Sequence, residues 1–384
     1  MEYCRWDCIT IDEKPISEEL FHVAETKVLQ RNRAENIGAS EFEILTATAF
    51  DIFTSENVEV AVVEVGMGGR DDATNILKHK DLTILTKIGL DHQSFLGDTI
   101  EEIASHKCGI FAKDVPVIYN ATNEAKVLQV INEESERVQT GRLWPVNSST
   151  ELPSLPSAAW EDFKKLMQDR EQQRIAVCTA WRAYSIMYDK MRPSDKPAER
   201  EKTRNAQSIL NVRWPGRLQM IDVFPLIPGV IQVESRALLD GAHNSQAAEN
   251  LAKVVDNEVR RIKGNGNVDG GRPVTWILAC TTGRDILNIT DSLLRPRDRV
   301  ASVEFGPVDG MPWISSQSSQ QIMGAIQEKY QDVEVTSRGR DIQAALQWAF
   351  EAGDPVVIAG SLYLAGDVLR MLRDVGGNIG VGET

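Results

Sequence analysis

The second half of the chain alternates short runs of β-branched residues with longer amphipathic stretches, and this alternation constrains the fold more than any other feature. It predicts strands near residues 230–239, 274–280, 299–305, 333–336 and 355–359, and helices over residues 244–260, 284–294, 318–329, 340–351 and 361–373. Strands that alternate with helices of this length form a parallel sheet with helices on both faces. We therefore predict an α/β chain whose C-terminal domain, residues 212–384, is doubly wound.

The first half of the chain, residues 1–211, predicts a second α/β domain. Its pattern is helical over residues 15–54, 99–112, 159–191 and 197–211, and strand-like over residues 58–65, 82–88 and 115–118. The run at 58–65 is rich in valine and ends in glycines, which is typical of a buried strand whose carboxyl end opens into a loop. A hinge is predicted at residues 212–217, between the two domains.

The composition narrows the class of protein. With 384 residues, of which 42% are hydrophobic, the chain can bury two cores of ordinary size. A net charge of -14 repels a phosphate backbone and an anionic membrane surface, so we expect neither nucleic-acid nor membrane binding. The five cysteines are scattered, and no apolar window approaches the roughly 20 residues of a membrane span. We expect a cytoplasmic protein with reduced thiols, and a mitochondrial form is equally compatible with the sequence.

Residues 64–75 form the first candidate cluster, directly after a predicted strand. Their glycines suggest a dinucleotide loop, but the G-x-G-x-x-G pattern needs glycine where Asp71 stands. Glu64, at the tip of the strand, offers a hard oxygen ligand to Mg²⁺, and Arg70 offers a planar fork to an anionic substrate. The competing interpretation is that Glu64 is merely solvated or caps a turn.

Two further candidates follow the next predicted strand. His92 belongs to the polar turn 89–92, so Glu64 and His92 would be neighbours if their strands are adjacent in the sheet. Lys107 lies near the end of the predicted helix 99–112, where the helix dipole favours any cation. Taken singly, His92 fits a structural histidine and Lys107 fits a solvated ammonium group.

A third cluster follows an apolar strand in the second domain. In an open α/β sheet ligands bind at the carboxyl ends of the strands, where Asp240 and His243 stand. Asp240 would accept hydrogen bonds from a sugar hydroxyl, and His243 would meet an anion. Arg217 follows Trp214-Pro215-Gly216 and would reach a phosphate with its planar fork. The alternatives are that Asp240 and His243 cap the following helix and that Arg217 is a surface residue.

Five motifs occur in a fixed order along the chain. They read Glu64-Val65-Gly66-x-Gly68-Gly69-Arg70-x-Asp72-Ala73-Thr74-Asn75, Gly89-Leu90-Asp91-His92-x-Ser94-Phe95-Leu96-Gly97-Asp98-Thr99, Lys107-x-Gly109-Ile110, Trp214-Pro215-Gly216-Arg217 and Asp240-Gly241-Ala242-His243-Asn244. Together they resemble the motifs of the folylpolyglutamate synthase and dihydrofolate synthase family, which belongs to the Mur ligase superfamily. Residues 310–314 and 360–364 look most like the fungal dihydrofolate synthase branch.

The resemblance implies an ATP-dependent ligase that adds L-glutamate to dihydropteroate, or to folates, through an acyl phosphate. It implies a P-loop-type Mur ligase central domain, a Rossmann-like C-terminal domain and a monomer. It also implies that Glu64, His92 and a carbamylated Lys107 hold Mg²⁺, because CO₂ turns a neutral amine into a carboxylate-like ligand. The other implied roles are Arg70 and Asp72 at the acceptor substrate, Asn75, Arg217 and Asp240 at ATP, and Lys107, Asp240 and His243 in catalysis.

Two departures from the family pattern leave a rival hypothesis open. The chain has no Gly-Lys dipeptide, and residues 9–17 resemble the region downstream of the family's Gly-rich phosphate loop, so we expect that loop to be missing. Its loss removes phosphate contacts and a central strand, which would leave residues 58–65 exposed. Gln172 and Ala176 also stand where the family has His and Asn.

The rival hypothesis is an impaired paralogue or an incomplete gene product that binds a nucleotide or a folate-like ligand without turnover. A nicotinamide-dependent oxidoreductase fits the doubly wound C-terminal half, but the glycine fingerprint of that class is absent from the sequence.

Overall fold

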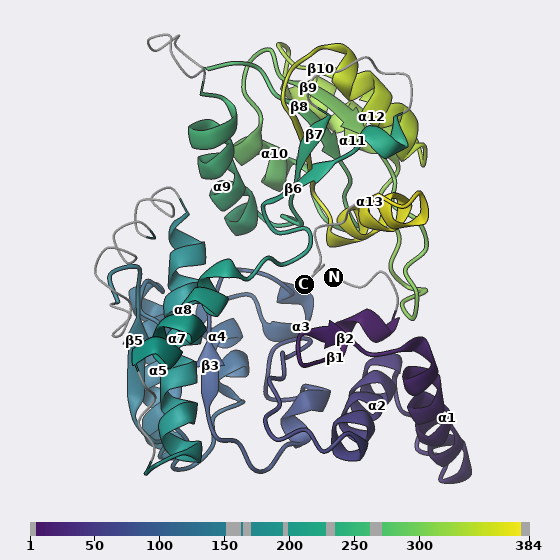
Figure 1. Ribbon diagram of the computed structural model, residues 1–384. Helices are drawn as coiled ribbons and strands as arrows, with labels where there is room; N and C mark the ends of the chain where they lie inside the picture. The colour runs from purple at the N-terminus through teal and green to yellow at the C-terminus, as the bar shows by residue number, and fades with distance from the viewer. Residues whose placement is uncertain are drawn as a thin grey trace. The chain divides into compact units, whose positions relative to one another are not determined.

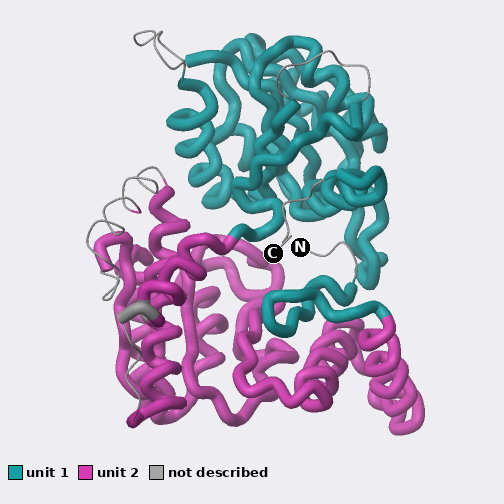
Figure 2. The backbone as a smooth tube through the Cα atoms, in the orientation of Figure 1, with its two compact units in different colours: residues 1–18, 213–384 teal, residues 19–212 magenta. Residues whose placement is uncertain are grey.

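A computed structural model of the protein describes residues 5–150, 163, 170–194, 199–227, 235–261 and 271–377. The chain forms two compact units, Glu19–Val212 and the combination of Met1–Glu18 with Arg213–Thr384 (Figure 2). The sequence analysis placed residues 1–211 together, whereas the structure groups the first residues of the chain with its C-terminal half. No helix within the described ranges combines the length and the hydropathy that a membrane crossing requires.

The sheet of the Glu19–Val212 unit has three parallel strands. In spatial order they are β3 (Thr83–Leu85), β4 (Val117–Asn120) and β5 (Leu143–Val146) (Figure 1). Successive side chains of a strand point to opposite faces, so Val117 and Ile118 belong to different cores. Val117 packs with α4 (Ile100–Cys108) and α5 (Ala125–Val138), and Ile118 packs with α7 (Glu171–Met191) and α8 (Glu199–Asn211). The strands predicted at 82–88 and 115–118 and the helix at 99–112 are confirmed.

Two helices precede this sheet, as the helical pattern predicts: α1 (Glu18–Ala34) and α2 (Glu41–Ser55). Helix α2 begins at a capping box, in which Ser40 Oγ accepts from the Glu43 amide at 3.3 Å and Glu43 Oε2 accepts from the Ser40 amide at 2.7 Å. Helix α4 begins in the same way at Thr99 and Glu102. Both helix starts are therefore set by local sequence. Of the predicted helix 159–191, residues 159–162 and 164–169 lie outside the described residues.

The strand predicted over residues 58–65 is absent from the described structure. The segment has no regular secondary structure, and Val62 is 91% and Val60 43% exposed. A strand needs a neighbour that bonds its backbone and covers its side chains, and within the described sheet β3 pairs only with β4. The prediction of a buried strand is therefore wrong, whereas the expected exposure of this segment is confirmed.

The second unit contains a six-stranded sheet in the order β10-β9-β8-β11-β7-β6. Its strands are β6 (Gln219–Asp222), β7 (Arg236–Leu239), β8 (Thr275–Leu278), β9 (Arg299–Ser302), β10 (Glu334–Ser337) and β11 (Val356–Ala359). The strands from β7 to β11 are parallel, and the edge strand β6 runs antiparallel to β7. The predicted parallel sheet is confirmed, and β6 is an addition that the sequence analysis missed. Of the strand predicted at 230–239, residues 230–234 lie outside the described residues, and β7 forms its end.

Helices cover both faces of this sheet, as predicted. They are α9 (Ser245–Val254), α10 (Leu287–Leu293) and α11 (Ser319–Lys329) on one face, and α12 (Ile342–Glu351) and α13 (Leu362–Asp374) on the other. In β11, Val357 faces the first group and Ile358 the second. The predicted helix 244–260 changes character, because α9 passes into a π-helical turn at Val255–Val259.

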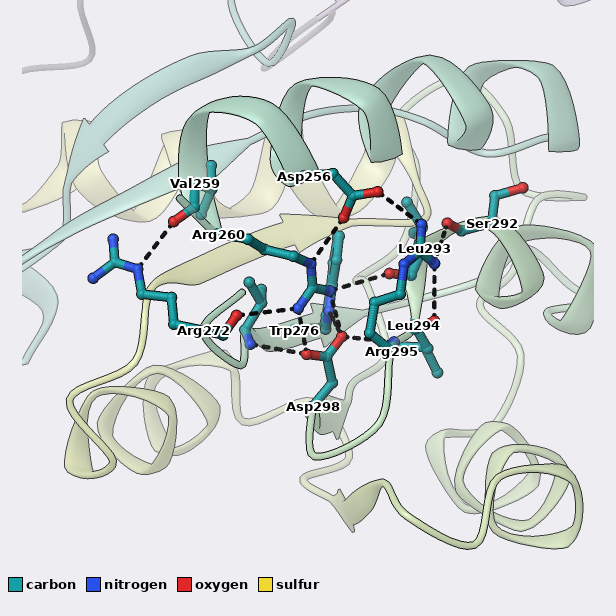
Figure 3. Close-up of polar contacts among 11 residues, drawn as sticks. Asp256, Val259, Arg260, Arg272, Trp276, Ser292, Leu293, Leu294, Arg295 and Asp298 are labelled. Atoms are coloured by element: carbon teal, nitrogen blue, oxygen red, sulfur yellow. Dashed lines mark hydrogen bonds and ion pairs between the residues drawn. The ribbon is translucent and has the colours of Figure 1, made fainter. Parts of the chain in front are cut away.

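A buried ion pair holds the end of that turn to the sheet (Figure 3). The carboxylate of Asp298 is fully buried and accepts from Arg260 Nη1 at 2.7 Å and Nη2 at 2.6 Å. The amides of Val274 and Arg295 and the indole Nε1 of Trp276 also donate to it, at 2.9 to 3.0 Å. A buried charge is tolerated when it is paired and its lone pairs are used, and Asp298 meets both conditions.

Short elements complete the fold. They are the antiparallel pair β1 (Thr10–Ile11) and β2 (Lys14–Pro15), the four-residue helix α3 (Gln93–Leu96), and 3₁₀ turns at Arg5–Cys8, Ala73–Ile76 and Phe224–Leu226.

Candidate functional site

The glycine-rich segment around Gly69 lies against the carboxyl end of α4. The Arg70 amide donates to His106 O at 2.9 Å. A Cβ atom on Gly109 would lie 2.4 Å from Arg70 Cβ, and one on Gly69 would lie 2.8 Å from Lys107 O. Real Cβ atoms do not approach backbone so closely, so glycine at 69 and 109 is required by this contact rather than by a turn. The contact brings the first predicted cluster to the end of the helix that carries Lys107.

Asp72 organises this segment from within. Its Oδ1 accepts from the Thr74 amide at 3.0 Å and from Thr74 Oγ1 at 2.6 Å, and its Oδ2 accepts from the Met67 amide at 2.8 Å. Asp72 is thus the N-cap of the 3₁₀ turn Ala73–Ile76. Both carboxylate oxygens are used to shape the loop, which keeps the neighbouring Arg70 in a fixed place.

Asn75 ties the same loop to α4 a second time. Its Nδ2 donates to Arg70 O at 3.0 Å and to Gly109 O at 3.1 Å. Its Oδ1 accepts from Lys80 Nζ, which also donates to Ile110 O at 2.9 Å. Burial lowers the pKa of Lys80 from its ordinary range. The structure therefore gives Asn75 an architectural task, and its predicted contact with ATP stays a prediction.

The side chain of Arg70 is anchored to two helices. Its Nη2 donates to Ser105 Oγ at 3.0 Å and to Ser105 O at 3.3 Å on α4. The same atom lies 3.9 Å from Glu134 Oε1 on α5, and Ser105 Oγ donates to that oxygen at 3.0 Å. The sequence analysis missed Ser105 and Glu134, because a serine and a glutamate on amphipathic helices carry no local signal of such a contact.

Lys107 lies on the last turn of α4, as predicted, and is half-buried. Burial lowers the pKa of Lys107, and the nearby Asp91 carboxylate opposes this shift in part. A lowered pKa increases the fraction of neutral amine at a given pH. The neutral amine is the form that reacts as a nucleophile. Lys107 lies beside the glycine-rich loop, because a Cβ atom on Gly69 would lie 2.8 Å from Lys107 O.

Glu64 and His92 are both exposed. His92 adopts a left-handed backbone with φ of 55° immediately before α3, a conformation that is uncommon for a non-glycine residue. Within the described residues, neither the Glu64 carboxylate nor the His92 imidazole makes a hydrogen bond or an ion pair. The carboxylate oxygens of Glu64 and the ring nitrogens of His92 are therefore not used by contacts within the described residues. No cluster of three or more His, Cys, Asp or Glu side chains suited to a metal occurs in the part of the chain that the structure describes.

In the other unit, Asp240 follows β7 and is buried. Its Oδ2 accepts from the Leu218 amide at 2.9 Å and its Oδ1 from the Ala242 amide at 2.8 Å. Burial raises the pKa of Asp240, and the two amides and the Arg217 guanidinium oppose this shift. The carboxylate therefore joins the turn that carries Arg217 to the end of β7. Arg217 itself is exposed, and its backbone amide donates to Trp214 O at 3.1 Å.

His243 is half-buried, and its Nδ1 lies 2.9 Å from Gly241 O. The suggestion that Asp240 and His243 cap the following helix is wrong. Asn244 is the N-cap of α9, because its Oδ1 accepts from the Ala247 amide at 2.9 Å. This N-cap has the usual sequence signal, because an asparagine directly precedes an amphipathic run of residues.

The nine predicted site residues thus fall into two separate groups. Glu64, Arg70, Asp72, Asn75, His92 and Lys107 belong to the Glu19–Val212 unit, and Arg217, Asp240 and His243 belong to the other. Within the first unit the structure brings Arg70, Asp72 and Asn75 together on the end of α4 beside Lys107. Within the second it brings Arg217 to Asp240.

The fold and the glycine-rich loop define a class of protein. A model of the Mur ligase middle domain matches residues 17–152, and a model described as the C-terminal domain of dihydrofolate synthetase matches residues 227–371. The chain is therefore a Mur-ligase-type α/β protein, with ATP-dependent ligation as its chemistry.

Curated relatives narrow the class to one family. A probable dihydrofolate synthetase of Schizosaccharomyces pombe is 34% identical over 375 residues, which is 96% of this chain and 84% of that protein. A dihydrofolate synthetase of Saccharomyces cerevisiae is 32% identical over 377 residues, which is 95% of this chain and 83% of that protein. The chain belongs to the dihydrofolate synthase and folylpolyglutamate synthase family of ATP-dependent glutamate ligases. The predicted resemblance to the fungal dihydrofolate synthases is confirmed.

Solved structures agree on the fold. A Mycobacterium tuberculosis folylpolyglutamate synthase, complexed with ADP and AMPPCP, has a TM-score of 0.69 at 23% identity, covering 96% of this chain and 81% of that one. E. coli FolC, in complex with DHPP and ADP, has a TM-score of 0.66 at 19% identity, covering 94% and 77%. The predicted α/β architecture of two domains with parallel sheets is that of this family.

Proposed function

We propose that the protein uses ATP to join L-glutamate to dihydropteroate, or to a folate in the sister activity. The γ-phosphoryl group is transferred to a carboxylate oxygen of the acceptor, which gives ADP and an acyl phosphate. The glutamate amino group then attacks the acyl carbon, loses a proton and displaces phosphate. The observation that supports this proposal most directly is the half-buried Lys107, with a lowered pKa, at the helix end where the glycine-rich loop packs.

The same lysine supports the proposal of a carbamate. Addition of CO₂ to the neutral amine forms an N–C bond and releases one proton, which leaves an anionic oxygen donor. Glu64, His92 and this carbamate supply the oxygen and nitrogen donors that would hold Mg²⁺. Magnesium is commonly held by one or two protein carboxylates together with substrate phosphates, so a complete protein cluster is not required. When bound, Mg²⁺ neutralises charge on the phosphoryl group that is being transferred.

The remaining residues are proposed to bind and orient substrates. Arg70, within the loop shaped by Asp72, is proposed to meet the acceptor substrate. Arg217, on the turn anchored by Asp240, is proposed to meet the phosphates of ATP. Asn75 and Asp240 are each proposed to contact ATP. His243 and Asp240 are proposed to act on the incoming glutamate. We expect the protein to work as a monomer, in the cytoplasm or in a mitochondrial form.

The test is glutamate-dependent phosphate release by the purified 384-residue protein with Mg-ATP and dihydropteroate or a folate, with the ligated product identified by mass spectrometry. Lys107→Ala should lower the rate about 10²-fold or more. Lys113→Ala is the matched control, because Lys113 is exposed and lies six positions further along the chain. A wild-type protein that releases no phosphate with either acceptor would overturn the proposal.

A second candidate function is ligand binding without turnover. The exposed segment 58–65 favours it, because the described sheet ends at β3 without a neighbour on that side. In that case the protein would bind a nucleotide or a folate-like ligand and release no phosphate. Calorimetry with Mg-ATP and with each acceptor, run beside the phosphate assay, separates the two candidates.

A further inference from the structure

We infer that Glu134 on α5, acting through Ser105 on α4, is a positioning residue for the Arg70 guanidinium. The inference rests on the proposed function, in which Arg70 meets the acceptor substrate, and adds two residues that lie outside the five motifs quoted above. Neither residue would touch the substrate. They would hold the Arg70 guanidinium in one position in the ligand-free protein.

The contacts form a continuous chain. Arg70 Nη2 donates to Ser105 Oγ at 3.0 Å, and Ser105 Oγ donates to Glu134 Oε1 at 3.0 Å. Glu134 Oε1 also lies 3.9 Å from Arg70 Nη2. A hydroxyl group that accepts from a guanidinium and donates to a carboxylate strengthens both hydrogen bonds, because each polarises the other. The side chain of Arg70 is therefore held at the end of α4, on the turn that precedes Lys107.

Glu134 is suited to this task because it is fixed itself. Its side chain is 15% exposed, and its Oε2 accepts from Arg137 Nε at 2.8 Å and from Arg137 Nη2. The two carboxylate oxygens thus have separate partners, Ser105 on one side and Arg137 on the other. A partly buried carboxylate with both oxygens engaged has few alternative rotamers, so it provides a rigid anchor.

Arg70 is suited to bind an anion from this position. Its side chain is 44% exposed, and within the described residues only Nη2 has hydrogen-bond partners. The donors on Nε and Nη1 remain available to a carboxylate or a phosphate, which guanidinium groups bind in a planar geometry. A side chain that is already ordered loses less entropy on binding, so removal of the anchor should weaken acceptor binding about two- to tenfold.

The first measurement needs no substrate. An arginine-selective dicarbonyl reagent such as phenylglyoxal labels free guanidinium groups, and mass spectrometry reads the labelling rate of Arg70 in the ligand-free chain. Glu134→Ala should raise that rate several-fold, and the conservative Glu134→Gln should restore part of the protection by keeping an oxygen for Ser105. Glu136→Ala is the matched control, because Glu136 is an exposed carboxylate on the same helix and takes no part in these contacts. An unchanged rate in Glu134→Ala would overturn the inference.

The second measurement connects the anchor to the substrate. In Glu134→Ala the KM or Kd for the acceptor should rise about two- to tenfold, with a smaller change in kcat, whereas Glu136→Ala should match the wild type. If the wild type binds the acceptor and Glu134→Ala binds it equally well, the inference is wrong. If the wild type binds no acceptor, the proposed function fails, and the labelling rates still decide the position of Arg70. Should Glu134→Ala not fold, Ser105→Ala breaks the same chain of contacts and replaces it in both measurements.

Discussion

At the scale of single residues, the buried pair of Arg260 and Asp298 makes a clear stability prediction. Asp298→Ala should lower the free energy of unfolding by about 3–5 kcal/mol, because it leaves the Arg260 guanidinium buried without its counter-charge. Chemical denaturation followed by circular dichroism measures the loss. The double variant Arg260→Met with Asp298→Leu should lose less than Asp298→Ala alone, because no uncompensated charge remains.

A pair in the same unit whose carboxylate is exposed provides the control, and its Arg299 side chain is 15% exposed. Arg299 Nε donates to Glu334 Oε2 at 3.0 Å, but the Glu334 side chain is 61% exposed. Glu334→Ala should therefore cost less than about 1 kcal/mol. If Asp298→Ala costs no more than Glu334→Ala, the buried network does not hold the π-helical turn in the way described.

Lys107 makes a prediction about pH. Its pKa is lowered in the folded protein, so the unfolded chain binds the proton more tightly and stability rises with pH up to the ordinary lysine range. Lys107→Met should be more stable than the wild type at pH 7, by less than about 1 kcal/mol, because solvent still reaches the ammonium group. That advantage should shrink as the pH rises toward about 10.4, the ordinary lysine value.

Denaturation at pH 7 and pH 10 in CO₂-free buffer checks the Lys107 prediction. Lys113→Met is the control, because Lys113 is exposed and should show no pH-dependent advantage. An advantage of Lys107→Met that grows with pH would contradict the role of burial.

At the scale of elements, the contact between the glycine-rich loop and α4 predicts opposite effects for two glycine substitutions. Gly109→Ala should destabilise the protein by about 1–3 kcal/mol and reduce acceptor binding, because its Cβ would lie 2.5 Å from Arg70 Cα and the backbone must move. Gly324→Ala, within α11, should stabilise by about 0.4–1 kcal/mol, because no atom lies within 4 Å of the added Cβ. Thermal unfolding and calorimetry compare the two variants, and equal effects would contradict the close approach.

The elements that the sequence predicted well are those whose own side chains carry the signal. The periods of 2 and 3.6 identify a core face, so β4 and α4 could be predicted from residues such as Val117 and Ile103. The run at 58–65 has the same strand signal, but the pattern does not report whether a neighbouring strand is present. β6 was missed for a different reason: only Ile221 of its four residues is buried, so its pattern is too weak.

The residues of the candidate site also differ in whether the sequence itself identifies them. Asp72, Asn75 and Lys107 were found because ordered motifs name them, and no propensity or periodicity would have selected them. Ser105 and Glu134 act through contacts between helices that are separated in sequence, so a single chain read alone gives no reason to choose them.

At the scale of the whole molecule, the exposed segment 58–65 predicts that the protein, which we expect to work as a monomer, self-associates at high concentration. Val62 is 91% exposed in a segment of high β-propensity, which is the usual composition of an edge that pairs with another chain. Val62→Lys should reduce association at high concentration and change the free energy of unfolding by less than about 0.5 kcal/mol. Sedimentation velocity and denaturation measure the two quantities.

Val23→Lys is the control for that prediction, because Val23 is 54% exposed but lies on the helix α1. A helix offers no unpaired backbone groups along its side, so this variant should associate as the wild type does. If both variants change association equally, general surface hydrophobicity explains the effect and the segment has no special part in it.

The position of the Arg260 and Asp298 pair has a consequence for the redesign of this protein. Asp298 directly precedes β9, and its partner amide at Val274 directly precedes β8. The buried ion pair therefore lies at the amino-terminal edge of the sheet. Asp240 follows β7 and occupies the opposite edge. Libraries randomised only at the carboxyl-terminal edge should therefore contain a high fraction of folded protein. A selection can then change substrate preference without compensating substitutions that restore stability.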